Sequence, residues 1–101
     1  MAAGLMAATI ARQIVEARGW GHARCQPFGL TQERILVGER WLGINTSLYD
    51  TTVELFAGRW IAGGRPTDPE AQSGPLDGTE PEQLVAAVEK LWQRLDTAKH
   101  L

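Results

Sequence analysis

The sequence is poor in the residues that build disulfides and metal centres: among 101 residues it has one cysteine, Cys25, and two histidines, His22 and His100. A single cysteine excludes a disulfide within the chain. His22 and Cys25 are spaced like two zinc ligands, but a structural zinc site needs four ligands and the sequence offers no second pair. We therefore predict no metal and no cofactor.

Catalytic signatures are also scarce. Cys25 and His22 have no third group that would orient the histidine as a base, so a nucleophilic cysteine is not indicated. The 11 glycines do not follow the spacing of a phosphate-binding loop. The sequence therefore predicts a protein that is not an enzyme.

Long apolar runs are missing as well. The start, MAAGLMAATI, is mostly apolar, but a membrane span needs about 20 such residues, and the positively charged stretch of a signal peptide is absent. A lone thiol suits a reducing compartment. We expect a cytoplasmic protein with no membrane partner.

The net charge of −2 is small but unevenly distributed. Residues 1–65 carry seven arginines and five acids, a net of +2, whereas residues 66–101 carry three basic residues and seven acids, a net of −4. So weak an excess does not by itself indicate binding to DNA or to an anionic membrane. The arginines keep nucleic-acid binding open as an alternative; they are Arg12, Arg18, Arg24, Arg34, Arg40, Arg59 and Arg65.

What the chain does contain is typical of one globular domain, 1–101: 44% apolar and 22% charged residues. Residues 3–18 have a helical period, and Gly19 follows as a helix-ending glycine. A second helix is predicted to follow Thr79, which forms a capping box with Glu82. The apolar stripe of this helix is Leu84, Val88, Leu91 and Leu95.

Between the helices, β-branched and aromatic residues predict two main strands, 34–44 and 52–62, joined by a loop over 45–50. A weaker edge strand over 22–30 is interrupted by Pro27. Residues 63–79, with three prolines and four glycines, predict a long polar loop. The expected fold is α+β, a two-layer sandwich of α-β-β-β-α order, with a three-stranded antiparallel sheet and two helices on one face.

The two main strands are apolar on both faces. In the second, Val53, Leu55 and Ala57 alternate with Phe56, Gly58 and Trp60. In the first, Ile35, Val37 and Trp41 are predicted to oppose Leu36, Leu42 and Ile44. Helices cover one face of such a sheet, and we expect something else, such as a second copy of the chain, on the other.

Four tryptophans are a high number for this length, and two of them follow an arginine. Trp and Arg are enriched where proteins bind one another, although tryptophans also fill cores, and we favour the core for Trp41 and Trp92. The sequence carries no family signature. Our leading hypothesis is a non-enzymatic protein–protein interaction module, for example an adaptor, a chaperone-like subunit or a small inhibitor such as a phage-encoded anti-defence protein. Its predicted partner-binding residues are Arg40, Trp41, Phe56, Arg59 and Trp60.

Two alternatives remain beside this hypothesis. One is nucleic-acid binding through the arginines of the N-terminal two-thirds, which steep salt dependence would reveal. The other is a small-molecule site with the 63–79 loop as its lid.

Overall fold

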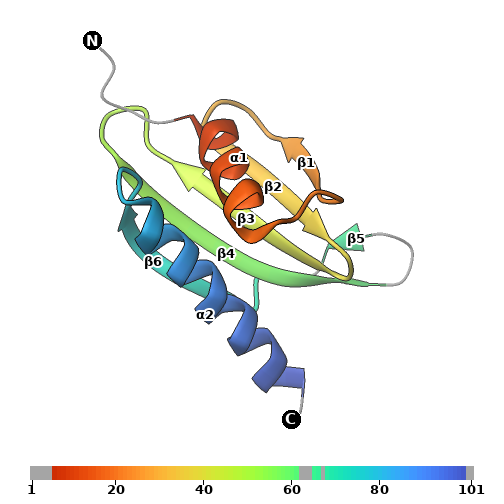
Figure 1. Ribbon diagram of the computed structural model, residues 1–101. Coiled ribbons are helices and arrows are strands. Elements are labelled where there is room, and N and C mark those ends of the chain that lie inside the picture. The colour runs from red at the N-terminus through yellow and green to blue at the C-terminus, as the bar shows by residue number, and fades with distance from the viewer. Residues whose placement is uncertain (1–5, 62–64, 67, 100–101) are drawn as a thin grey trace.

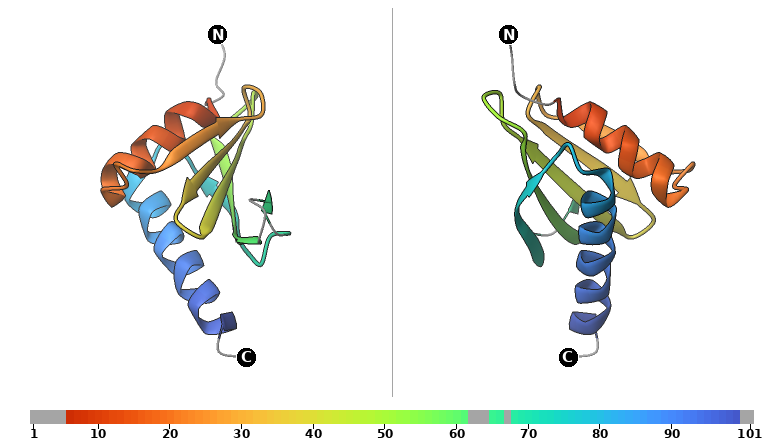
Figure 2. Two further views of the ribbon diagram at one scale, coloured as in Figure 1. Left: turned by 90° about the vertical axis from the view of Figure 1, so that its right-hand side faces the viewer. Right: turned by 60° about the vertical axis from the view of Figure 1, so that its left-hand side comes forward.

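The structure is a computed structural model that describes residues 6–61, 65–66 and 68–99. Its elements are α1 (Ala7–Arg18), β1 (Arg24–Pro27), β2 (Gln32–Val37), β3 (Arg40–Thr46), β4 (Thr52–Ile61), β5 (Arg65–Pro66), β6 (Ala71–Asp77) and α2 (Pro81–Lys99). The strands form an antiparallel sheet, and both helices lie on one side of it (Figures 1 and 2). The predicted α+β class is confirmed.

The sheet has more strands than the three predicted. Five strands lie side by side in the order β1-β2-β3-β4-β6, and the two-residue β5 pairs with the end of β4. Every neighbouring pair is antiparallel. Two features that sequence patterns conceal account for the difference.

The first feature is a tight turn inside the run 34–44, which we predicted to be one strand. Val37 pairs with Arg40, so Gly38 and Glu39 form a two-residue hairpin turn, and Gly38 has the positive φ of 61° that such turns require. The turn also changes the faces. Because Leu36 lies opposite Trp41, these two share one face, while Leu42 joins Ile35 on the other. Our prediction that Ile35 and Trp41 share a face is therefore wrong.

The second feature is β6, which occupies residues that we predicted to be part of the 63–79 loop. Gly74, with a φ of 77°, lies in a bulge where the register against β4 shifts between Glu54 and Phe56. Pro75 is tolerated because β6 lies at an edge of the sheet. Glycine and proline thus mark an irregular edge strand here, not a loop.

The helix ends follow local chemistry. Gly19 closes α1 in the left-handed conformation, with a φ of 68°, and its N–H bonds to Glu16, as predicted. At the other helix the predicted capping box is not formed, because Thr79 donates both its N–H and its hydroxyl to Asp77. The first turn of α2 begins after Glu80, whose carbonyl accepts the Leu84 N–H.

The core lies between the sheet and the helices. α1 packs over β1, β2 and β3, and α2 packs over β4 and β6 (Figure 1). The predicted α2 stripe is buried throughout, against strand residues that alternate along β2, β3 and β4. Trp20 and Trp92 stack with ring centroids 5.1 Å apart, which links the end of α1 to α2. The buried strand residues are Ile35, Leu42, Ile44, Val53, Leu55 and Ala57.

Candidate functional site

The face of the sheet opposite the helices is the candidate site, and we call it the open face. Its residues alternate with the core residues along β2, β3 and β4, as the sheet register requires. The edge-on view in Figure 2 shows no helix on this side. The described residues that β1 to β4 place on it by register are Arg24, Gln26, Gln32, Arg34, Leu36, Trp41, Gly43, Asn45, Thr52, Glu54, Phe56 and Gly58.

Trp41 lies flat on the open face. Its ring covers two glycines: a Cβ atom at Gly58 would lie 2.6 Å from the indole Nε1, and one at Gly43 would lie 2.9 Å from Cζ3. Only glycine leaves room for the ring at these positions. The side chain is only 3% exposed although it is outside the main core, and its Nε1 has no hydrogen-bond partner. Trp41 therefore belongs to a small second layer, in agreement with the buried role we favoured.

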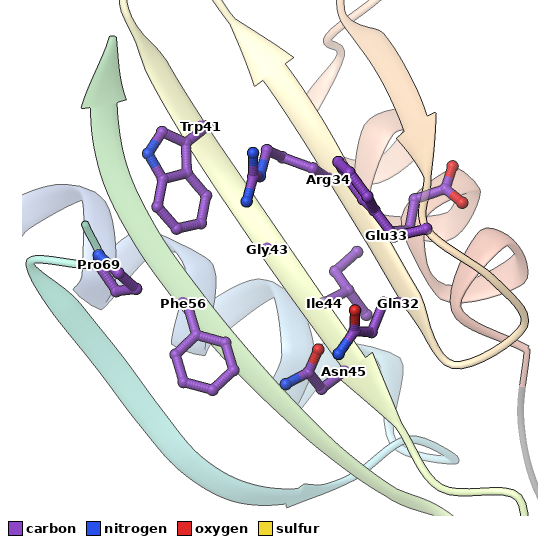
Figure 3. A pocket seen from close by; sticks show the side chains of 10 residues that line it. Gln32, Glu33, Arg34, Trp41, Gly43, Ile44, Asn45, Phe56 and Pro69 are labelled. Carbon is purple, nitrogen blue, oxygen red and sulfur yellow. The ribbon is translucent and has the colours of Figure 1, made fainter. Parts of the chain in front are cut away.

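The Arg34 side chain lies over the Trp41 ring. Its guanidinium lies 4.7 Å from the centroid of the Trp41 ring and 5.0 Å from that of Phe28. Figure 3 shows the side chain reaching from β2 across β3 toward Trp41. Such cation–π contacts hold a guanidinium in place without consuming its N–H donors.

A pocket of about 290 Å³ opens beside this pair, over Gly43 in the middle of the sheet (Figure 3). Arg34, Gly43 and Phe56 are opposite one another across three strands, so the missing side chain at Gly43 leaves a depression between two large ones. The pocket combines apolar walls with polar groups, as binding sites for organic ligands and peptides do. Its lining is Phe28, Gln32, Glu33, Arg34, Trp41, Gly43, Ile44, Asn45, Phe56 and Pro69.

The five residues predicted to bind a partner do not form one surface. Trp41 and Phe56 lie together on the open face, as expected. Arg40 and Arg59 are opposite each other on the helix-bearing face, because each lies two residues along its strand from a core residue, Leu42 or Ala57. Trp60 belongs to β4, but its side chain lies outside the described residues.

Arg40 and Arg59, which lie on the helix-bearing face and not on the open face, both contact the C-terminal part of α2. Arg40 donates to the Trp92 carbonyl at 3.4 Å and pairs with Asp96. Arg59 donates to the Leu95 carbonyl and forms an ion pair of 3.0 Å with Glu70. Guanidinium groups at the carbonyl end of a helix are favourable for the helix dipole. These contacts assign Arg40 and Arg59 to the fold.

Two residues that sequence reasoning missed complete the site. Phe28 lies in the β1–β2 turn, where a loop residue gives no periodic signal, and it is 54% exposed. Arg34 was considered only as one of seven dispersed arginines. Its position opposite Gly43 follows from the hairpin register, which the undetected turn at Gly38 sets.

Exposed apolar residues gather at one end of the molecule, next to the open face. They lie in the β1–β2 turn, in the β3–β4 turn and at the start of α1, which share an end of the sheet in Figures 1 and 2. Phe28 belongs both to this end and to the pocket. Clustered exposed apolar residues mark interaction surfaces more often than scattered ones do. The large ones among the described residues are Met6, Phe28, Leu30, Leu48 and Tyr49.

Two titratable groups near the site have raised pKa values. Glu33 is buried, and this burial raises the pKa of its carboxyl. Cys25 is exposed as a residue, yet desolvation of its thiol, and next the nearby Glu33 carboxylate, raise its pKa. A raised pKa keeps the thiol protonated and weakens it as a nucleophile. In the described part of the chain no three His, Cys, Asp or Glu residues are grouped to hold a metal ion.

A second groove, of about 350 Å³, separates β6 from α2 and is lined by residues such as Leu76, Ala87, Lys90 and Arg94. It has no aromatic wall, and Arg94 is engaged by the Gln72 carbonyl. We therefore treat the open-face pocket as the stronger candidate.

None of the described helices is both long and apolar enough to cross a membrane.

Comparisons with known proteins do not assign the chain to a family. No protein-family model, no curated protein and no solved structure matches the chain.

Proposed function

We propose that this protein is a non-enzymatic protein-interaction module that binds a segment of another protein on its open face. One observation carries the proposal: the sheet face without helices holds a pocket walled by Phe28, Trp41 and Phe56, with the Arg34 guanidinium beside it. Aromatic residues and arginine are the types that dominate binding energy at protein interfaces.

The edges of the sheet favour binding on the face. Pairing with a partner strand needs a free run of backbone donors and acceptors. The β1 edge ends at Pro27, and the β6 edge carries Pro75 beside the Gly74 bulge. Such features block strand addition. A partner segment would therefore contact side chains on the open face.

The pocket also supports a partner protein over a second copy of the chain. By register the open face carries Arg24 and Arg34 as well as the carboxylates Glu54 and Asp77, but of these four only Arg34 lines the pocket. A symmetric dimer centred on the pocket would bring the two copies of Arg34 near one another, and like charges oppose such contact. The proposal includes a reducing, cytoplasmic location. The protein has a single cysteine, Cys25, and desolvation raises the pKa of its thiol, so the thiol stays protonated.

The test is selection of peptide ligands from a displayed library of random peptides about 12 residues long. We expect ligands that bind the wild type and Lys90→Ala, a control in the β6–α2 groove, but lose affinity about tenfold or more for Phe56→Ser. Circular dichroism would confirm that Phe56→Ser is folded. Ligands that bind both variants equally well, or no ligands at all, would contradict the proposal.

Small-molecule binding is the second candidate, and Pro69 favours it. This residue belongs to the connection between β5 and β6 and lines the pocket, as the predicted lid would. Nucleic-acid binding has less support, because the described arginines are divided between the two sides of the sheet and two of them hold α2.

A further inference from the structure

Among the described residues that line the pocket, Arg34 is the only one with a permanent positive charge. The two ion pairs among the described residues involve Arg40 and Arg59, and neither involves Arg34. Its guanidinium instead contacts two aromatic rings, those of Phe28 and Trp41. A half-buried guanidinium held between rings keeps a planar set of donors ready for an acceptor.

Among the described residues, no carboxylate of the open face forms an ion pair with Arg34. Asp77 is in register with Thr52, two residues from Glu54 along β4. Glu54, the carboxylate on this face in β4, is in register with Asn45 and Pro75. Arg34 lies in the neighbouring row, opposite Gly43 and Gln26. Glu33, the preceding residue along β2, has the opposite side-chain orientation, and it lies in register with core residue Ile44.

The remaining polar groups of the pocket suit a carboxylate. The amides of Gln32 and Asn45, which are in register with each other, line the same depression (Figure 3), and each amide carries N–H donors. Apolar walls on either side, Phe28 and Phe56, limit the water that competes for these donors. Charge-assisted, two-point hydrogen bonds between arginine and carboxylate are among the strongest in proteins.

We propose that the pocket recognises an aspartate or glutamate side chain in the bound protein segment, with Arg34 as the specificity-determining residue. The inference rests on the proposed function and names the chemistry of its partner: an acidic residue flanked by apolar residues. The carboxylate accepts hydrogen bonds from Arg34, and the flanking apolar residues pack on Phe28 and Phe56. A phosphate group fits less well, because it normally engages several cations or backbone N–H groups, and this pocket has one cation.

The experiment uses two libraries of displayed peptides that differ only in composition: one contains all residue types, and the other omits Asp and Glu. Both are selected on the intact protein, and binders are sorted by whether Phe56→Ser abolishes their binding. The inference expects open-face binders from the complete library alone, with Asp or Glu in each family of selected peptides. Replacing that acid by its amide should weaken binding about tenfold or more.

The outcomes separate the two proposals. Open-face binders from both libraries at equal affinity would overturn the carboxylate inference and leave the protein-binding proposal standing. No open-face binders from either library would overturn both. Selected phosphopeptides that exceed their Glu counterparts would likewise contradict the choice of carboxylate.

A charge-matched pair of variants tests the residue itself. Arg34→Gln and Arg24→Gln remove the same charge from the same face, but Arg24 is in register with Leu36 and does not line the pocket. We expect Arg34→Gln to lose about tenfold or more in affinity for an acid-containing peptide, and Arg24→Gln to lose little. Arg34→Lys should be intermediate, because lysine keeps the charge without the planar pair of donors. Equal losses of affinity in both glutamine variants would show that the effect comes from the net charge of the open face, and would contradict a specific role of Arg34.

Discussion

At the scale of single residues, the open face depends on two glycines. Gly43 and Gly58 are beneath the Trp41 ring, and each lacks the atom that would push the ring away. The ring in turn supports the Arg34 guanidinium from one side. A change at either glycine should therefore alter both stability and the geometry of the pocket.

Gly58→Ala tests this packing. Its Cβ would lie 2.6 to 2.8 Å from three atoms of the rigid indole, so the ring must move. We expect a loss of about 1–3 kcal/mol, the usual cost of overpacking, measured by urea unfolding. Gly21→Ala is the control: nothing lies within 4 Å of its added Cβ, and its effect should stay within about 0.5 kcal/mol. Equal stability of the two variants would show that Trp41 does not lie on Gly58.

Glu33→Gln should stabilise the protein at neutral pH. Burial raises the pKa of Glu33 above its ordinary value of 4.5, and its Oε1 has no hydrogen-bond partner. The folded state therefore favours the protonated carboxyl, so this residue contributes stability below about pH 4.5, and that contribution is lost as the pH rises through the folded pKa.

The measurement compares thermal unfolding of the wild type and Glu33→Gln across this range. The variant should have the higher midpoint near about pH 7, and the difference should shrink toward about pH 4. A lower midpoint for the variant at neutral pH would mean that the ionised carboxylate stabilises the fold.

At the scale of elements, the helices could be predicted and the sheet only in part. The α2 stripe and the Gly19 terminus follow from a period and a local conformation, both written in consecutive residues. The turn at Gly38–Glu39 leaves an unbroken apolar run on both sides, so one long strand was the simpler prediction. β6 was missed because the Gly74 bulge and Pro75 have the composition of a loop.

The same limits explain which residues of the candidate site could be predicted from the sequence. Trp41 and Phe56 were predicted from residue type, and both line the pocket. Arg40 and Arg59 were chosen because each precedes a tryptophan, but neighbours in a strand point to opposite faces. Phe28 and Arg34 join the pocket through strand register and a turn, which depend on pairing between distant residues.

Arg40→Ala separates the role of this arginine in the fold from partner binding. The variant loses the contacts to the Trp92 carbonyl and Asp96 near the end of α2. We expect a loss of about 0.5–1.5 kcal/mol and faster amide exchange in the last turns of α2, seen by hydrogen exchange. Affinity for open-face peptides should be unchanged. A large loss of that affinity in a folded variant would return Arg40 to the binding surface.

At the scale of the whole molecule, the two sides of the sheet have different roles. The helix side contains the core, and its arginines Arg40 and Arg59 are bound to α2. The open side presents Arg34 and the aromatic pocket, which continues through Phe28 into the apolar end of the molecule. With a proline in each edge strand, at the end of β1 and inside β6, the open face is the surface best suited to a partner.

The most direct measurement of this claim is an NMR titration of the ¹⁵N-labelled protein with a peptide selected on the wild type. The Trp41 indole Nε1–H, which has no partner in the free protein, should shift together with the amides of Gly43, Asn45 and Phe56. This result would place the ligand on the open face. Shifts confined to the β6–α2 groove, around Leu76, Ala87 and Lys90, with an unchanged Trp41 indole, would contradict the account.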